Sequence, residues 1–258
     1  MKKWRMISEE ELDRLVEERV KMNMEQMSHS YERELLMKQA NIQVLQSQIN
    51  PHFLYNALEC IRGKAMLEGS EDIAVIAEEL SSFFRYSISG KGDMVTLADE
   101  LENVKSYVNI QKFRFKSKFI FQVTFDDEEE RSRINSIVMP KLVLQPIVEN
   151  AILHGFADMS SGARIEIRVT PVNDNMSIVV SDNGKGMTQE QLQVLKRRIS
   201  FEEENAESEK RTHIGIQNVN KRIKLLFGED YGLSINSYEG MGTEVEVFIP
   251  CIQSELKS

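Results

Sequence analysis

The stretch V-V-S-D-N-G-K-G-M at residues 179–187 decides the fold, because an apolar strand ends there at an acid followed by two closely spaced glycines. Such a strand places the carboxylate of Asp182 at the end of a sheet, where it can accept the amino hydrogen of adenine. Gly184 and Gly186 let the backbone turn sharply and approach a ligand closely. An ordinary hairpin turn can have the same sequence, so the neighbouring motifs must decide whether this stretch binds a ligand or only forms a turn.

The segment E-N-A-I-L-H-G at residues 149–155 places two polar residues near the end of an otherwise apolar helix. Burying Glu149 and Asn150 without partners would cost several kcal/mol. A bound ion or ligand would remove this cost, and the side-chain carbonyl of Asn150 suits Mg²⁺, which prefers oxygen ligands. An internally hydrogen-bonded polar network is the alternative.

Two further glycine motifs follow, T-H-I-G-I-Q-N-V at residues 212–219 and G-M-G-T at residues 240–243. Gly215 precedes a helix whose first N–H groups could face phosphates. Each motif alone could be an ordinary turn. The order and spacing of all four motifs indicate one nucleotide site.

The C-terminal half alternates strand and helix patterns. Strands are expected at residues 119–125, 165–169, 176–181, 233–238 and 244–249, and helices at residues 142–153, with Pro140 in the first turn, and 214–227. This order predicts an α/β sandwich whose mixed sheet is covered on one face. The charged segment 188–212 lies between two glycine motifs, and we expect it to be a mobile nucleotide lid, with a solvated loop as the alternative.

The N-terminal half has a helical pattern. Residues 8–50 contain no Gly or Pro, and their four-three apolar spacing favours a parallel dimeric coiled coil over a helix packed on its own domain. Pro51 should kink the chain before His52. An αα-hairpin should follow, with helices over residues 52–67 and around 73–84, then a hinge at Gly90 and Gly92. Thr96 and Asp99 form a capping box for a helix ending near residue 115.

Composition excludes several classes of protein. The net charge of −9 over 258 residues disfavours binding to nucleic acid or to an anionic bilayer. Cys60 and Cys251 lack the spacing of a zinc site or a disulfide framework, which indicates a reducing compartment. Because no apolar run of about eighteen residues occurs, we expect no signal peptide or membrane span. The expected location is cytoplasmic, with membrane attachment only through a sensor region outside this chain.

The segment L-Q-S-Q-I-N-P-H-F-L-Y-N-A-L-E at residues 45–59 is typical of one family. With the four motifs above, it makes the chain resemble the LytS/YesM-type sensor histidine kinases, with a GHKL (Bergerat-type) ATP-binding domain, over about residues 40 to 250. The implied α+β fold has an N-terminal coiled-coil helix and a helical hairpin for dimerisation, followed by a GHKL-type α/β sandwich with a mixed sheet. The implied divisions are a signalling helix (1–44), a phosphoacceptor domain (45–116), a catalytic domain (117–252) and a tail (253–258).

The resemblance implies a homodimeric protein histidine kinase of a two-component system. It implies that His52 accepts a phosphoryl group from Mg-ATP and passes it to an aspartate of a response regulator. It also makes Asn150 the Mg²⁺ ligand, Asp182 the adenine-binding carboxylate and Glu149 a general base or polarising group. The remaining residues expected around ATP are His154, Gly155, Gly184, Gly186, Met187, Gly215, Asn218, Gly242 and Thr243.

Two positions depart from the family pattern. His213 stands where many relatives have glycine, and Phe53 stands where many histidine kinases have an acid after the acceptor histidine. Asn56, one helical turn beyond His52, could orient a water for a phosphatase activity or simply hydrogen-bond within the hairpin. Two rival functions remain: a GHKL ATPase in which Glu149 activates water, and a dimeric scaffold with a degenerate nucleotide site.

Overall fold

The computed structural model describes residues 51–88, 93–114, 119–126, 131–156, 159, 161–200 and 214–253. The predicted coiled coil over 8–50, the glycine hinge, residues 201–213 of the expected lid and most of the predicted tail lie outside these residues. Within the described ranges, no helix is long and apolar enough to cross a bilayer.

The first described element is a helical hairpin made of α2 (Pro51–Leu67) and α3 (Glu71–Ile88). Between them, Gly69 has a φ of +70°, a conformation that glycine adopts without a steric penalty. The carbonyl of Ser70 then accepts the N–H groups of Ile73 and Ala74, both at 3.1 Å. The two predicted helices and the turn between them are confirmed.

A capping box starts α4 (Leu97–Arg114), as the sequence predicts. The Asp99 N–H donates to Oγ1 of Thr96 at 3.1 Å, and the Thr96 N–H donates to Oδ2 of Asp99 at 3.3 Å. Val104 and Val108 of this helix are fully buried in the same core as the sheet residues. The helix therefore packs as part of the sheet's own core.

The sheet has five strands in the order β2-β4-β5-β7-β6. Only β2 and β4 are parallel, and the other neighbours are antiparallel. The sheet is therefore mixed, as predicted. The strands are β2 (Phe119–Phe125), β4 (Ala163–Val172), β5 (Asn175–Asp182), β6 (Gly232–Tyr238) and β7 (Gly242–Pro250).

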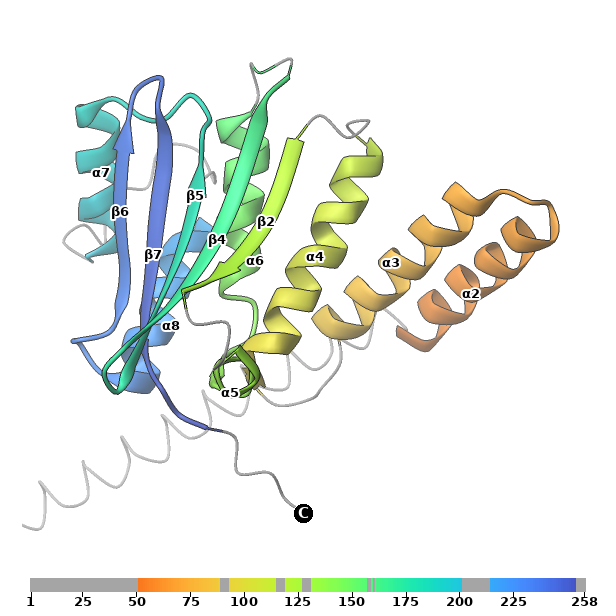
Figure 1. Ribbon diagram of the computed structural model, residues 1–258, viewed down its shortest axis with the longest axis horizontal. Helices are drawn as coiled ribbons and strands as arrows, with labels where there is room; N and C mark the ends of the chain where they lie inside the picture. The colour runs from red at the N-terminus through yellow and green to blue at the C-terminus, as the bar shows by residue number, and fades with distance from the viewer. Residues whose placement is uncertain are drawn as a thin grey trace, which may run out of the picture. The chain divides into compact units, whose positions relative to one another are not determined.

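One face of the sheet is apolar and covered by helices. Ile165, Ile167 and Val169 alternate along β4 and are fully buried, whereas Arg164 and Arg168 between them are exposed. Figure 1 shows α6 and α8 behind this face and α7 beside β6. The predicted sandwich with one covered face is confirmed, and its helices are α6 (Leu144–Asn150), α7 (Gln189–Ile199) and α8 (Ile214–Phe227).

The start of the buried helix differs from the prediction. Pro140 does not open a helix, because it ends β3 (Val138–Pro140), which pairs with β1 (Met94–Thr96). Leu142 has a left-handed φ of +59°, so regular helix begins only at Leu144. Beyond Asn150 the helix widens into a π-helical turn, η1 (Ala151–Gly155).

The predicted lid differs as well. Its first part, Gln189–Ile199, is the regular helix α7, with Leu192, Leu195 and Ile199 buried in the core. Thr188 and Gln191 form a capping box at its start. The expectation of a mobile segment from residue 188 is therefore wrong for the residues up to 199, because three core side chains and a capped first turn hold them. A short helix not predicted from the sequence, α5 (Arg131–Asn135), precedes β3.

Candidate functional site

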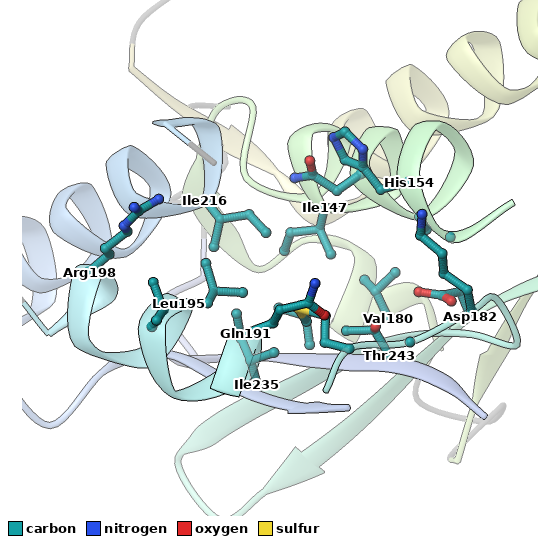
Figure 2. A pocket seen from close by; sticks show the side chains of 18 of the residues that line it. Ile147, His154, Val180, Asp182, Gln191, Leu195, Arg198, Ile216, Ile235 and Thr243 are labelled. Carbon is teal, nitrogen blue, oxygen red and sulfur yellow. The ribbon is translucent and has the colours of Figure 1, made fainter. Parts of the chain in front are cut away.

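A cavity of about 530 Å³ lies between the sheet and the helices α6, η1, α7 and α8. Figure 2 shows Asp182 and Arg198 at opposite ends of it, with Ile147 and Val180 between them. The sequence-predicted residues that line the cavity are Asn150, His154, Gly155, Asp182, Gly186, Met187 and Thr243. All four motifs thus contribute residues to this cavity, the third of them through Ile216.

Asp182 is the last residue of β5, opposite Thr243 of β7. Its Oδ1 accepts the N–H of Gly184 at 2.8 Å. Burial raises the pKa of Asp182 to about 6, although the backbone N–H groups of Gly184 and Thr243 oppose this shift by stabilising the ionised form. A carboxylate held this way can accept a ligand hydrogen inside the cavity.

Close backbone contacts explain the glycines around Asp182. A Cβ on Gly184 would lie 2.5 Å from the Cα and carbonyl oxygen of Gly155. A Cβ on Gly242 would lie 1.9 Å from the carbonyl oxygen of Asp182, and Gly242 also has a φ of +102°. Gly186 has a φ of +63°, and a Cβ there would lie 1.9 Å from the carbonyl oxygen of Tyr238. The motif glycines therefore allow three backbone segments to meet beside the carboxylate.

Asn150 ends α6 and lines the same cavity. Its Nδ2 donates to the carbonyl oxygen of Pro146 at 2.8 Å, which fixes the amide and leaves Oδ1 as its acceptor. An amide oxygen suits Mg²⁺, which commonly takes one or two protein ligands together with phosphates and waters. In the described ranges no group of three or more His, Cys, Asp or Glu side chains is arranged to hold a metal ion.

Other predicted residues lie away from this cavity. Glu149 does not line the cavity. Burial of Tyr107 in α4 raises the pKa of its hydroxyl, and the negative charge of Glu149 raises it further. Asn218 is exposed on α8 and does not line the cavity. Gly215, also outside the lining, contacts Pro146 closely, since a Cβ there would lie 3.4 Å from the proline Cβ. Ile216 is the α8 residue that does line it.

The two predicted residues of the hairpin are both on α2. His52 and Asn56 follow the helix start at Pro51, and the side chains of both are exposed. Exposure leaves both accessible to a partner in solution.

Sequence reasoning missed several lining residues. Gln191, Leu195 and Arg198 come from α7, and Lys185 comes from the middle of the D-N-G-K-G motif. The spacing of Leu192, Leu195 and Ile199 after a Thr-x-x-Gln capping box is the signal that could have identified α7. Helix α7 also brings two charged residues of opposite sign to the lining, Glu190 and Arg198.

Comparison with protein families gives two matches in tandem. Residues 40–119 match the histidine kinase family model. Residues 136–253 match the model of the histidine kinase-, DNA gyrase B- and HSP90-like ATPases, a class that binds ATP. The second match contains the whole cavity lining.

Several relatives align with most of the chain. The sensor histidine kinase YesM of Bacillus subtilis is 36% identical over 227 residues, which cover 88% of this chain and 36% of YesM. The sensor protein LytS of Enterococcus faecalis is 32% identical over 222 residues, covering 86% of this chain and 36% of LytS. The sensor histidine kinase BtsS of Escherichia coli is 31% identical over 225 residues, covering 87% of this chain and 36% of BtsS. The chain thus spans little more than a third of these relatives.

Solved structures give more distant matches. The histidine kinase domain of a blue-light activated histidine kinase from Erythrobacter litoralis has a TM-score of 0.42 and 16% identity, covering 78% of this chain and 96% of that chain. The catalytic domain of histidine kinase ThkA has a TM-score of 0.42 and 17% identity, covering 61% of this chain and 94% of that chain. On the two family matches and the relatives, the chain belongs to the histidine kinase family, in the group that contains the sensor kinases LytS and YesM.

Proposed function

We propose that this chain binds Mg-ATP in the cavity beside Asp182 and transfers the γ-phosphoryl group to His52. The single observation that carries this proposal is that Asn150 and Asp182, 32 positions apart, line one cavity of about 530 Å³. That volume lies within the usual range of small-ligand sites. The apolar walls, including Ile147, Val180 and Ile235, suit a purine base, and Asp182 would accept its amino hydrogen.

Asn150 is the proposed protein ligand of Mg²⁺. When bound, the ion would neutralise negative charge on the phosphates as transfer proceeds. The chain's own contribution is to fix the amide by its bond to Pro146 and to hold the Asp182 carboxylate among closely packed glycine backbone segments. Because Glu149 does not line the cavity, we assign it to orienting groups near Asn150 rather than to taking a proton.

In the proposed reaction a ring nitrogen of neutral His52 forms a bond to the γ-phosphorus of ATP. The bond from that phosphorus to the bridging oxygen breaks, ADP leaves, and the imidazole N–H proton passes to solvent. An aspartate carboxylate of a response regulator then forms a bond to the phosphorus, the bond from phosphorus to the His52 nitrogen breaks, and the ring takes a proton from solvent to regenerate neutral imidazole. Asn56, exposed one turn beyond His52, is the proposed group for orienting water in a phosphatase reaction.

The assembly proposed for this activity is a homodimer formed through α2 and α3. Exposed apolar side chains on the hairpin support it, among them Phe53, Ile61, Met66, Leu67, Ile73 and Val75. The domain division at residues 44, 116 and 252 stays a prediction. A cytoplasmic location and a membrane-bound sensor region elsewhere in the protein belong to the same proposal.

Incubation with γ-labelled ATP and Mg²⁺ tests the proposal. The parent should acquire acid-labile label, and His52→Gln, Asn150→Asp and Asp182→Asn should each lose it. His29→Gln is the matched control and should label like the parent. Label retained in His52→Gln would assign the acceptor to another residue.

The rival functions give different results in the same assay. An ATPase would release labelled phosphate without labelling the protein, and His52→Gln would hydrolyse ATP at the parent rate. A scaffold with a degenerate site would bind no Mg-ATP in calorimetry. Either result would replace the kinase proposal.

A further inference from the structure

A buried carboxylate outside the cavity holds the start of α6. Glu100, in α4, has no exposed surface. Its Oε1 accepts the N–H groups of Val143 at 2.6 Å and Leu144 at 2.9 Å, and its Oε2 accepts that of Leu142 at 2.9 Å. The first N–H groups of a helix lack partners within the helix. The N-cap residue of α6, Val143, has no side chain that can accept these N–H groups. Glu100, more than forty residues earlier in the chain, accepts them instead.

The same carboxylate binds the helical hairpin. The hydroxyl of Tyr86, in α3, donates to Oε2 of Glu100. Burial first, and the charge of Glu100 next, raise the pKa of Tyr86, so the hydroxyl keeps its proton and remains a donor. One carboxylate therefore joins α3, α4 and α6.

Two cations surround this group. Lys141 lies with Nζ 4.9 Å from the centre of the Tyr86 ring. Arg222, in α8, donates from Nη2 to the carbonyl oxygen of Leu142 at 2.9 Å. Burial lowers the pKa of both cations, and the charge of Glu100 opposes that shift in each. The buried negative charge is therefore compensated.

The backbone that these groups hold is unusual. Leu142 has a left-handed φ of +59°, which is unfavourable for a bulky residue. Its N–H is bound by Glu100 and its carbonyl by Arg222. Such conformations persist where surrounding contacts fix them and occur frequently at functional sites.

The α3 end of the cluster continues to α2. Tyr55 of α2 donates its hydroxyl to the carbonyl oxygen of Phe84 at 3.3 Å, and the Arg85 guanidinium lies 5.6 Å from the centre of the Tyr55 ring. Tyr86 is the next residue along α3. Consecutive residues of α3 thus contact α2 and the carboxylate that holds α6.

We propose that Glu100 and Tyr86 are positioning residues for phosphoryl transfer: Glu100 fixes the start of α6 and thereby Asn150 at its end, and Tyr86 ties this anchor to the hairpin. The inference rests on the proposed function, since it assumes that Asn150 holds Mg²⁺. With seven residues, α6 is about 10 Å long, so displacement at its first turn moves Asn150 with it. Asp182 is on β5, outside the helix whose start this anchor holds.

The experiment measures nucleotide affinity by calorimetry on the full chain, with ATP plus Mg²⁺ and with ATP plus EDTA. Glu100→Gln should weaken binding of Mg-ATP by about tenfold, the size of effect expected for a residue that orients a metal ligand. Binding of ATP in EDTA should stay close to that of the parent. Tyr86→Phe should give a smaller loss in the same direction, and Glu102→Gln, on the exposed side of α4, should match the parent.

Equal losses with and without Mg²⁺ in Glu100→Gln would overturn the proposal, because they would show a general structural defect. If Glu100→Gln does not fold, the Mg²⁺ dependence of nucleotide binding by Tyr86→Phe tests the proposal instead, because that variant keeps the packed ring and loses only the hydroxyl. An unchanged Mg²⁺ dependence in Tyr86→Phe would then overturn it. If the parent binds no Mg-ATP, the proposed function itself fails; if the parent binds but all three variants match it, only this inference fails.

Discussion

The Asp182 carboxylate costs free energy to bury in ionised form. Its pKa rises from 3.8 to about 6 on folding, so the folded chain binds a proton more tightly than the unfolded chain. The contribution of Asp182 to the free energy of unfolding is therefore largest below pH 4 and is lost as the pH rises to about 6. The loss is on the order of 3 kcal/mol.

Asp182→Asn should remove this dependence. Relative to the parent, the variant should gain stability as the pH rises from 4 to 7, measured by urea unfolding at each pH. Asp230→Asn, in the exposed turn before β6, is the control. A parent-minus-variant difference that stays constant over this range would contradict the assignment.

Gly184 gives a second prediction at this scale. Gly184→Ala should abolish nucleotide binding and lower the melting temperature, because the new Cβ would lie 2.5 Å from backbone atoms of Gly155. Gly63→Ala, in α2 with nothing within 4 Å, should instead stabilise the chain, by about 1 kcal/mol. Calorimetry with ATP and thermal unfolding of both variants check this, and normal ATP binding by Gly184→Ala would exclude the close contact.

At the scale of elements, the capping box of α7 is the feature to test. The Gln191 N–H donates to Thr188 Oγ1 at 3.3 Å, and the Thr188 N–H donates to Gln191 Oε1 at 3.0 Å. Thr188→Ala should destabilise the chain by about 1 kcal/mol in denaturant unfolding. It should also weaken ATP binding, because α7 supplies Leu195 and Arg198 to the cavity. Gln193→Ala, on the exposed side of α7, should do neither.

The helices whose apolar pattern continues over many residues could be predicted well from the sequence. The helix over residues 214–227 and α2 have nearly the predicted extents, and α3 extends a few residues beyond the predicted apolar stretch at both ends. Their turns and caps are local signals. The start of α6 could not be predicted, since Leu142 adopts its conformation through Glu100, a distant residue. The expectation of mobility is wrong for residues 188–199, because the charged residues of α7 make its three buried apolar positions hard to recognise in the sequence.

The candidate site was predictable to a similar extent. Asn150 and Asp182 were identified because polar residues and glycines interrupt apolar segments there. Glu149 follows the same pattern, yet adjacent helical positions point in different directions, so only Asn150 lines the cavity. The contribution of Arg198 depends on how α7 packs on the sheet, which no local pattern encodes.

For the whole molecule, the exposed apolar residues of the hairpin predict a dimer. Ile61 is 50% exposed and Ile73 is 47% exposed. Ile61→Glu combined with Ile73→Glu should yield monomers in sedimentation analysis, since burying two new charges in the interface is unfavourable. ATP affinity should be unchanged, because the described residues that line the cavity lie between positions 147 and 245, outside the hairpin. Ile120→Glu, an exposed apolar residue on β2, is the control and should remain dimeric.

The strand order has a consequence for biosynthesis. Among the five described strands of this sheet, β7 comes last along the chain, yet it lies inside the sheet between β5 and β6, and it supplies Thr243 and Val245 to the cavity. A nascent chain therefore cannot gain stability from nucleotide until β7 has left the ribosome. Any product terminated before that strand would leave the edge of β5 unpaired, and we expect it to aggregate or be degraded rather than compete for ATP.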